Sequence, residues 1–196
     1  MNEQLRLGCC ATFIRAFLLC VLLIPTGVLA DQNHPGLDPL FTQLKTVSDQ
    51  VSADRITGEI WGLWRQVDDN GAATALAQGT RAMSSQRYRE AYHYFSEVIE
   101  RAPDFAEGWN KRATVLYLAE AYDRSIQDIK ETLRREPRHF GALSGLGLIF
   151  LHQRQYAPAA NAFRNALAIN PHLPRIRRAL DQLEQRQRAV DEENTI

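Results

Sequence analysis

The fold is decided by three stretches of sequence: YREAYHYFSEVIERAP at residues 88–103, YDRSIQDIKETLRREP at residues 122–137 and YAPAANAFRNALAINP at residues 156–171. Each stretch begins with tyrosine, ends with proline and starts 34 residues after the one before it. A period of about 34 residues is typical of a helix–turn–helix unit that stacks on its neighbours into a solenoid. The period therefore predicts stacked helix pairs with a concave face that binds other molecules.

The repeats run over residues 72–105, 106–139 and 140–173, and they agree position by position. Because antiparallel helices about 8 to 10 Å apart can approach closely only where a side chain is nearly absent, small residues should mark the helix contacts. These small residues are Gly79, Ala113 and Gly147 at the eighth position of each repeat, and Ala91, Ser125 and Ala159 at the twentieth. The proline ends the second helix, since proline cannot continue a helix interior.

The pattern resembles the tetratricopeptide repeat family over residues 72–173. The resemblance implies an all-α fold, a right-handed α-solenoid of antiparallel helix pairs. The alternative is an ordinary antiparallel bundle whose apolar stripes happen to align. Three tyrosines, three prolines and three pairs of small residues in register argue against that coincidence.

Residues 37–71 match the same frame only as a degenerate repeat, after a linker at residues 31–36. Ile56, Ile60 and Val67 recur at helical spacing, which predicts a helix from about Ala53 to Gln66. We interpret this region as an N-terminal helical hairpin that caps the N-terminal end of the stack. The sequence Asp-Asp-Asn-Gly at residues 68–71 predicts the turn into the first repeat.

The segment after the last repeat has one apolar face, formed by Leu173, Ile176, Leu180 and Leu183. Terminal repeats need a helix with a polar outer side, because an exposed stacking surface would aggregate. We therefore expect a C-terminal capping helix over residues 174–188 and a disordered tail over residues 189–196.

Residues 1–30 have the pattern of a cleaved secretory signal peptide. Arg6 and Arg15 precede an apolar run, and Val28-Leu29-Ala30 offers a cleavage site with small residues. The uninterrupted run is shorter than the roughly 20 residues that span a bilayer, although an uncleaved inner-membrane anchor stays open as an alternative. Twenty arginines against three lysines suggest a GC-rich bacterial genome, so we expect a periplasmic location.

Composition argues against nucleic-acid binding and against disulfides in the mature chain. Basic and acidic residues number 23 each, whereas proteins that bind nucleic acid carry a basic field. The three cysteines all lie within residues 1–30, so cleavage would leave none.

The sequence offers no convincing catalytic, cofactor or metal site. The histidines are His34, His93, His139, His152 and His172. No two of them have the i, i+4 spacing on a helix that could hold a metal ion. His139 and His172 follow the repeat prolines, where loops lie on the surface, so we expect both to be exposed. We expect a protein without cofactors that is not an enzyme.

The resemblance also implies a ligand groove, lined by the first helix of each repeat. The candidate groove residues are Leu76, Thr80, Met83, Asn110, Thr114, Tyr117, Leu118, Ser144, Leu148, Leu151 and His152. Family members that clamp a carboxylate use basic and Asn side chains at set positions, where this chain has Leu76, Thr80, Lys111, Gly141 and Gly145. Lys111 alone cannot form such a clamp. An apolar groove with Asn110 and His152 as its polar points would suit a peptide, unless the C-terminal helix fills it.

These features favour a scaffold or adaptor that binds a protein or peptide segment in the bacterial envelope. One alternative is a structural protein that self-associates through Trp61, Trp64 or its end faces, and another is a membrane-anchored assembly factor. An enzyme with an unrecognised site is a further class. The sequence specifies neither the partner nor the oligomeric state.

Overall fold

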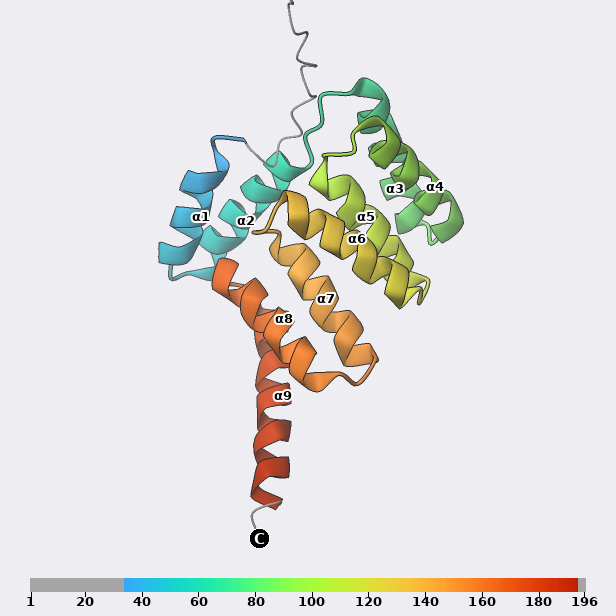
Figure 1. The fold of residues 1–196 in the computed structure, drawn as a ribbon. Helices are drawn as coiled ribbons and strands as arrows, with labels where there is room; N and C mark the ends of the chain where they lie inside the picture. The colour runs from blue at the N-terminus through green and yellow to red at the C-terminus, as the bar shows by residue number, and fades with distance from the viewer. Residues whose placement is uncertain (1–33, 194–196) are drawn as a thin grey trace, which may run out of the picture.

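The computed structural model describes residues 34–193, and this part of the chain is all-α (Figure 1). Its helices are α1 (Leu37–Thr46), α2 (Gln50–Trp64), α3 (Asn70–Ser84), α4 (Tyr88–Arg101), α5 (Ala106–Leu118), α6 (Tyr122–Arg135), α7 (Phe140–His152), α8 (Tyr156–Ile169) and α9 (Pro174–Glu193). Helices α3 to α8 form three successive antiparallel pairs, one in each predicted repeat. The predicted α-solenoid is therefore confirmed.

The turn inside each repeat is built the same way three times. Gln86, Glu120 and Arg154 have positive φ angles of 58°, 57° and 58°. The next residue donates its N–H across the turn, as from Arg87 to the carbonyl of Ala82 at 2.9 Å. A left-handed residue followed by such a bond ends a helix and satisfies its last carbonyl groups. The repeated tyrosine then begins α4, α6 and α8.

In the first and third repeats, the glycine at the eighth position makes room for the aromatic ring of the twenty-fourth residue. A Cβ atom on Gly79 would lie 2.6 Å from the ring of Phe95, and one on Gly147 would overlap the ring of Phe163. We had expected the eighth residue to meet the small twentieth residue. That contact is explicit in the second repeat, where the Ser125 hydroxyl donates to the carbonyl of Ala113 at 2.7 Å.

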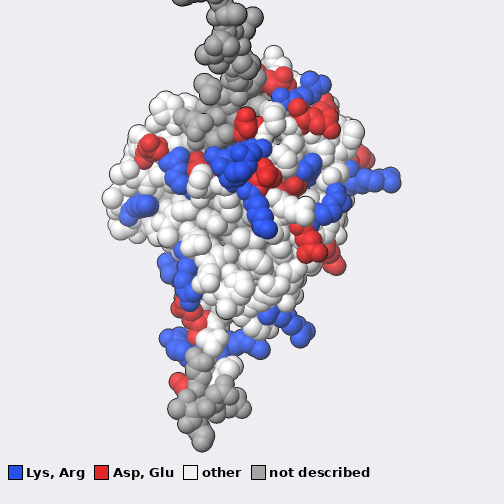
Figure 2. Space-filling model, viewed as in Figure 1, with Lys and Arg blue, Asp and Glu red and all other residues white. Residues whose placement is uncertain are grey.

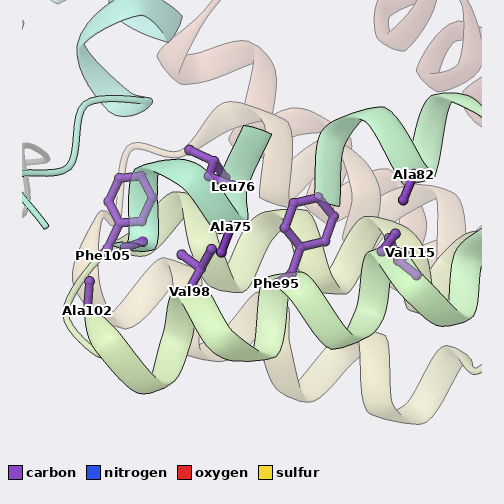
Figure 3. Packing of buried hydrophobic residues seen from close by; sticks show 10 residues of the cluster. Ala75, Leu76, Ala82, Phe95, Val98, Ala102, Phe105 and Val115 are labelled. Carbon is purple, nitrogen blue, oxygen red and sulfur yellow. The ribbon is translucent and has the colours of Figure 1, made fainter. Parts of the chain in front are cut away.

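Phe95 lies at the centre of the first repeat's core, between α3 and α4 (Figure 3). Its side chain is fully buried together with Ala75, Val98 and Phe105. Val115 of α5 belongs to the same cluster, which joins the first repeat to the second. Burial of apolar area at these junctions stabilises the stack, because each helix pair alone leaves one apolar face uncovered.

The N-terminal hairpin of α1 and α2 does not cap the first repeat, so that interpretation was wrong. The hairpin packs beside the last repeat, where its apolar cluster includes Phe140 and the half-buried Ile169 and Leu173. This cluster contains no residue of α3 or α4. Figure 1 shows the hairpin on the far side of α5 to α7 from α3 and α4, with a connection running over the top.

The composition of α3 explains why its outer face needs no cap. Ala73, Thr74, Ala77 and Arg81 are exposed there and provide no large apolar side chain to pack against. By contrast, Phe140 offers a large ring to the hairpin. Burial of apolar surface therefore favours docking of α1 and α2 on the third repeat.

Helix α9 covers the last repeat through Leu180 and Leu183, which are buried against α8. The helix extends to Glu193, past the predicted end at residue 188, so residues 189–193 are helical and do not belong to a disordered tail. Residues 194–196 and the predicted signal segment lie outside the described residues. None of the helices within residues 34–193 is long and apolar enough to cross a membrane.

Candidate peptide-binding groove

A cavity of about 260 Å³ opens between α5 and α7, with α6 as its floor. Its lining residues are Asn110, Ala113, Thr114, Tyr117, Leu118, Ser125, Ile129, Gly141, Ala142, Ser144, Gly145, Leu148 and Ile149. No charged side chain lines this space. Ser125 and Ile129 are buried, whereas Leu118 at the edge is 42% exposed.

The structure brings most of the predicted groove residues of α5 and α7 together at this cavity. They are Asn110, Thr114, Tyr117, Leu118, Ser144 and Leu148. His152 does not line the cavity but lies beside one end of it, where its ring contacts that of the lining residue Tyr117 and that of Tyr122, with centroids 5.7 Å apart in both cases. Burial raises the pKa of the Tyr117 hydroxyl, and the nearby Tyr122 adds to the shift.

The predicted groove residues of α3 do not reach this cavity. Leu76 is buried in the core of the first repeat, and Met83 packs against the same core. The Thr80 hydroxyl donates to the carbonyl of Leu76 at 2.8 Å. The cavity therefore belongs to the second and third repeats.

Several polar side chains of the cavity lining donate hydrogen bonds within the chain. The hydroxyl groups of Thr114 and Ser144 donate to the carbonyl groups of Asn110 and Phe140, at 2.9 and 2.7 Å. The Asn110 amide donates to the Glu107 carboxylate at 2.7 Å, and its side chain is buried. One N–H of the Asn110 amide is thus engaged within the chain. The cavity presents an apolar surface.

Helix α9 does not fill the cavity. Leu148 and Leu151 are half-buried beside the cluster that contains Leu180 and Leu183. Leu118 remains exposed on the other side of the opening. Helix α9 therefore approaches the groove only on the side of Leu148 and Leu151, and it does not cover Leu118.

A buried polar cluster anchors the hairpin at the other end of the cavity. His139 is fully buried, not exposed as we had expected. Its Nδ1 accepts the N–H of Ala142 at 3.0 Å and so caps α7, while Nε2 lies 3.2 Å from the Glu107 carboxylate. Because Nδ1 accepts a hydrogen bond, Nε2 carries the proton and donates it to Glu107.

The hairpin contributes two tryptophans to this cluster. Trp64 stacks on the His139 ring, and its Nε1 donates to Glu136 at 3.3 Å. Trp61 covers Gly141, where a Cβ atom would lie 2.7 Å from the indole. Trp64 is 2% exposed, which leaves no Trp64 surface for the proposed self-association.

Glu107 is ionised inside this cluster. Burial alone would raise the pKa of its carboxyl group, but the hydrogen bond from His139 and the charge of Lys111 hold that pKa below its ordinary value. Lys111 lies 3.4 Å from the second carboxylate oxygen and is thereby engaged within the chain. The sequence contained no local signal for this arrangement, because its members come from α2, α5 and the turn before α7.

Comparison with known proteins identifies the repeats. The sequence profile of the tetratricopeptide repeat family matches residues 76–132 and 119–174. A TPR repeat-containing protein of Rhizobium etli is 37% identical over 170 residues, which span 80% of this chain and 82% of the relative. The chain belongs to the tetratricopeptide repeat family.

Other known proteins resemble the chain over shorter ranges or at lower identity. The Hsp70-Hsp90 organizing protein of Triticum aestivum is 31% identical over 51% of this chain, which corresponds to only 17% of that protein. Among solved structures, the TPR2B domain of yeast Sti1 in its pHsp70 complex aligns with a TM-score of 0.57 at 19% identity, over 60% of this chain and 99% of the domain. MamA aligns with a TM-score of 0.58 at 14% identity, over 74% of this chain and 90% of the MamA chain. At these identities the structures show a shared fold.

The described part of this tetratricopeptide repeat protein holds no group of three or more His, Cys, Asp or Glu side chains that could bind a metal ion. Positive and negative side chains are interspersed on the face shown in Figure 2, and the surface over α7 and α8 is largely uncharged. The uncharged lining of the cavity between α5 and α7 is suited to holding an apolar group.

Proposed function

We propose that this protein is a non-catalytic scaffold or adaptor that holds a segment of a partner protein between α5 and α7. One observation carries the proposal. The inner-face residues of two successive repeats converge on an open apolar cavity, in which the Thr114 and Ser144 hydroxyl groups already donate to backbone carbonyls. An open apolar surface bordered by exposed Leu118 is typical of an interaction site.

The relatives support the same class of function. The TPR2B domain of yeast Sti1 and the first TPR of Spaghetti (RPAP3) were solved with pHsp70 and with an HSP90 peptide, respectively. This chain differs at the place where a carboxylate would be clamped, because Lys111 is paired with Glu107. We therefore propose a partner segment that is held through apolar side chains and not through a terminal carboxylate.

The test is affinity capture with Leu118→Arg as the groove variant. Arginine at this position places a charge at the edge of the cavity and should remove partners held there. Val51→Arg is the matched control, because Val51 is 81% exposed on α2 and lies outside the cavity lining. Loss of the same partner from both variants, or from neither, would refute the groove assignment.

We further propose that the protein acts in the bacterial envelope after export. The support is the basic, apolar and small-residue order of residues 1–30. Expression with a C-terminal tag, fractionation and intact mass measurement should find a periplasmic protein that begins at Asp31. A membrane-bound product with residues 1–30 retained would instead support the anchored assembly factor.

A further inference from the structure

Gly145 has no packing reason to be glycine. A Cβ atom there would meet only the Cδ1 atom of Ile129, at the ordinary contact distance of 3.8 Å. At Gly79 and Gly147, by contrast, an aromatic ring occupies the place of a Cβ atom, so only glycine fits. Glycine inside a helix destabilises it relative to alanine, so a glycine that nothing crowds leaves open space at a cost to α7. That space is part of the cavity between α5 and α7.

Gly141, one helical turn before Gly145, shows how such a space is filled. The indole of Trp61 lies directly on Gly141, in T-shaped contact with Phe140. Gly141 also lines the cavity. The open space at Gly145 therefore continues an interface that already exists, in which a large ring packs against the bare backbone of α7.

The lining restricts what can enter. At about 260 Å³ the cavity lies below the roughly 300 to 1,000 Å³ of pockets that hold whole small molecules, and its size suits one large side chain. The cavity lining offers no charged partner, so a buried charge there would be left uncompensated. Thr114 and Ser144 already donate their hydroxyl protons to backbone carbonyls.

We propose that the space at Gly145 receives one large uncharged side chain of the partner segment, leucine or phenylalanine in kind, beside the site where Trp61 covers Gly141. This inference rests on the proposed function and specifies the chemistry of the bound segment. The partner side chain packs on α7 next to Trp61, one helical turn further along. Ala113, Thr114 and Leu148 form the walls around it.

The experiment is an NMR titration of the protein from Asp31 to Ile196, which contains every helix described here. The probes are N-acetyl-phenylalaninamide and N-acetyl-leucinamide, with N-acetyl-lysinamide and N-acetyl-aspartamide as charged comparisons. The apolar probes should shift the methyl signals of Ala113 and Leu148 and the amide signal of Gly145. The charged probes should bind there at least about tenfold more weakly, since an unpaired charge would be desolvated.

Gly145→Leu should weaken binding of both apolar probes at least about tenfold, because its side chain occupies the space. Gly58→Leu is the matched control, since no atom lies within 4 Å of the position of its Cβ on α2. Equal binding of charged and apolar probes, or undiminished binding to Gly145→Leu, would overturn the proposal. So would concentration-dependent shifts of the same signals without a probe, because they would identify a second copy as the occupant.

Two outcomes separate this inference from the proposed function. If Leu118→Arg loses a captured partner while Gly145→Leu keeps it, the groove function stands and the Gly145 subsite is wrong. If the apolar probes bind at Gly145 but no partner depends on Leu118, the subsite stands and the scaffold function fails.

Discussion

The imidazole of His139 lies parallel to the indole of Trp64, with ring centroids 4.3 Å apart and an interplanar angle of 8°. This stack joins the N-terminal hairpin to the start of α7. The same imidazole caps α7 and bonds to Glu107 of α5. Three parts of the chain that are distant in sequence thus meet at one ring.

Trp64→Ala should lower the free energy of unfolding by about 3 to 5 kcal/mol, since it removes a large buried side chain and leaves a cavity. Urea unfolding followed by circular dichroism measures this loss. Trp64→Phe keeps an aromatic ring and loses the hydrogen bond to Glu136, so it should cost less than the alanine variant. A loss below about 1 kcal/mol for Trp64→Ala would show that the hairpin does not depend on this contact.

Glu107→Gln should flatten the acid dependence of stability. Because the folded-state pKa of Glu107 is lowered, its carboxylate contributes stability above the unfolded-state pKa of about 4.3 and loses it as the pH falls through the folded-state value. The wild type should therefore be more stable than the variant at pH 7, and the difference should shrink toward pH 3. Urea unfolding at several pH values measures both proteins. A difference that stays constant with pH would contradict the prediction.

Two glycines of α7 should respond in opposite directions to the same substitution. Gly147→Ala should destabilise the protein by about 1 to 3 kcal/mol, because its methyl group would overlap the buried ring of Phe163. Gly145→Ala should stabilise it by up to about 1 kcal/mol, since alanine is the better helix former and meets no close atom. Thermal unfolding of the two variants side by side tests the pair. A similar shift of both melting temperatures would contradict the prediction, because it would show that overlap with Phe163 does not lower the stability.

The ion pair of Arg112 and Asp128 should matter more than the pairs on the surface. Arg112 donates two hydrogen bonds to Asp128, at 2.8 and 2.9 Å, and the Asp128 carboxylate is buried. Asp128→Ala should cost about 3 kcal/mol of unfolding free energy, because it leaves the Arg112 side chain, which is only 17% exposed, without its carboxylate partner.

The exposed pair of Arg87 and Glu90 provides the comparison for Asp128→Ala. Glu90→Ala should change the free energy of unfolding by no more than about 1 kcal/mol. The double variant Arg112→Met with Asp128→Leu should recover part of the loss, since it leaves neither charge behind. Equal losses of unfolding free energy for Asp128→Ala and Glu90→Ala would show that the pair of Arg112 and Asp128 contributes no more than an exposed surface pair.

The repeated part of the fold could be predicted from the sequence because its determinants are local. The tyrosine that begins α4, α6 and α8, the proline beyond each second helix, and the glycine opposite Phe95 or Phe163 all lie within one repeat. Part of the candidate groove followed from the resemblance to the tetratricopeptide repeat family, which implies that Tyr117, Leu118 and Leu148 lie on the inner face. The cavity between α5 and α7 places these residues around one space.

Within the three repeats, the sequence by itself determined which segments are helical and how the helices pair. Only the tertiary structure decided where the N-terminal hairpin docks, because an apolar face can pack against any complementary surface within reach. The large ring of Phe140 provides that surface, and the small and polar outer residues of α3 do not. The same contact buried His139 and covered Gly141 with Trp61.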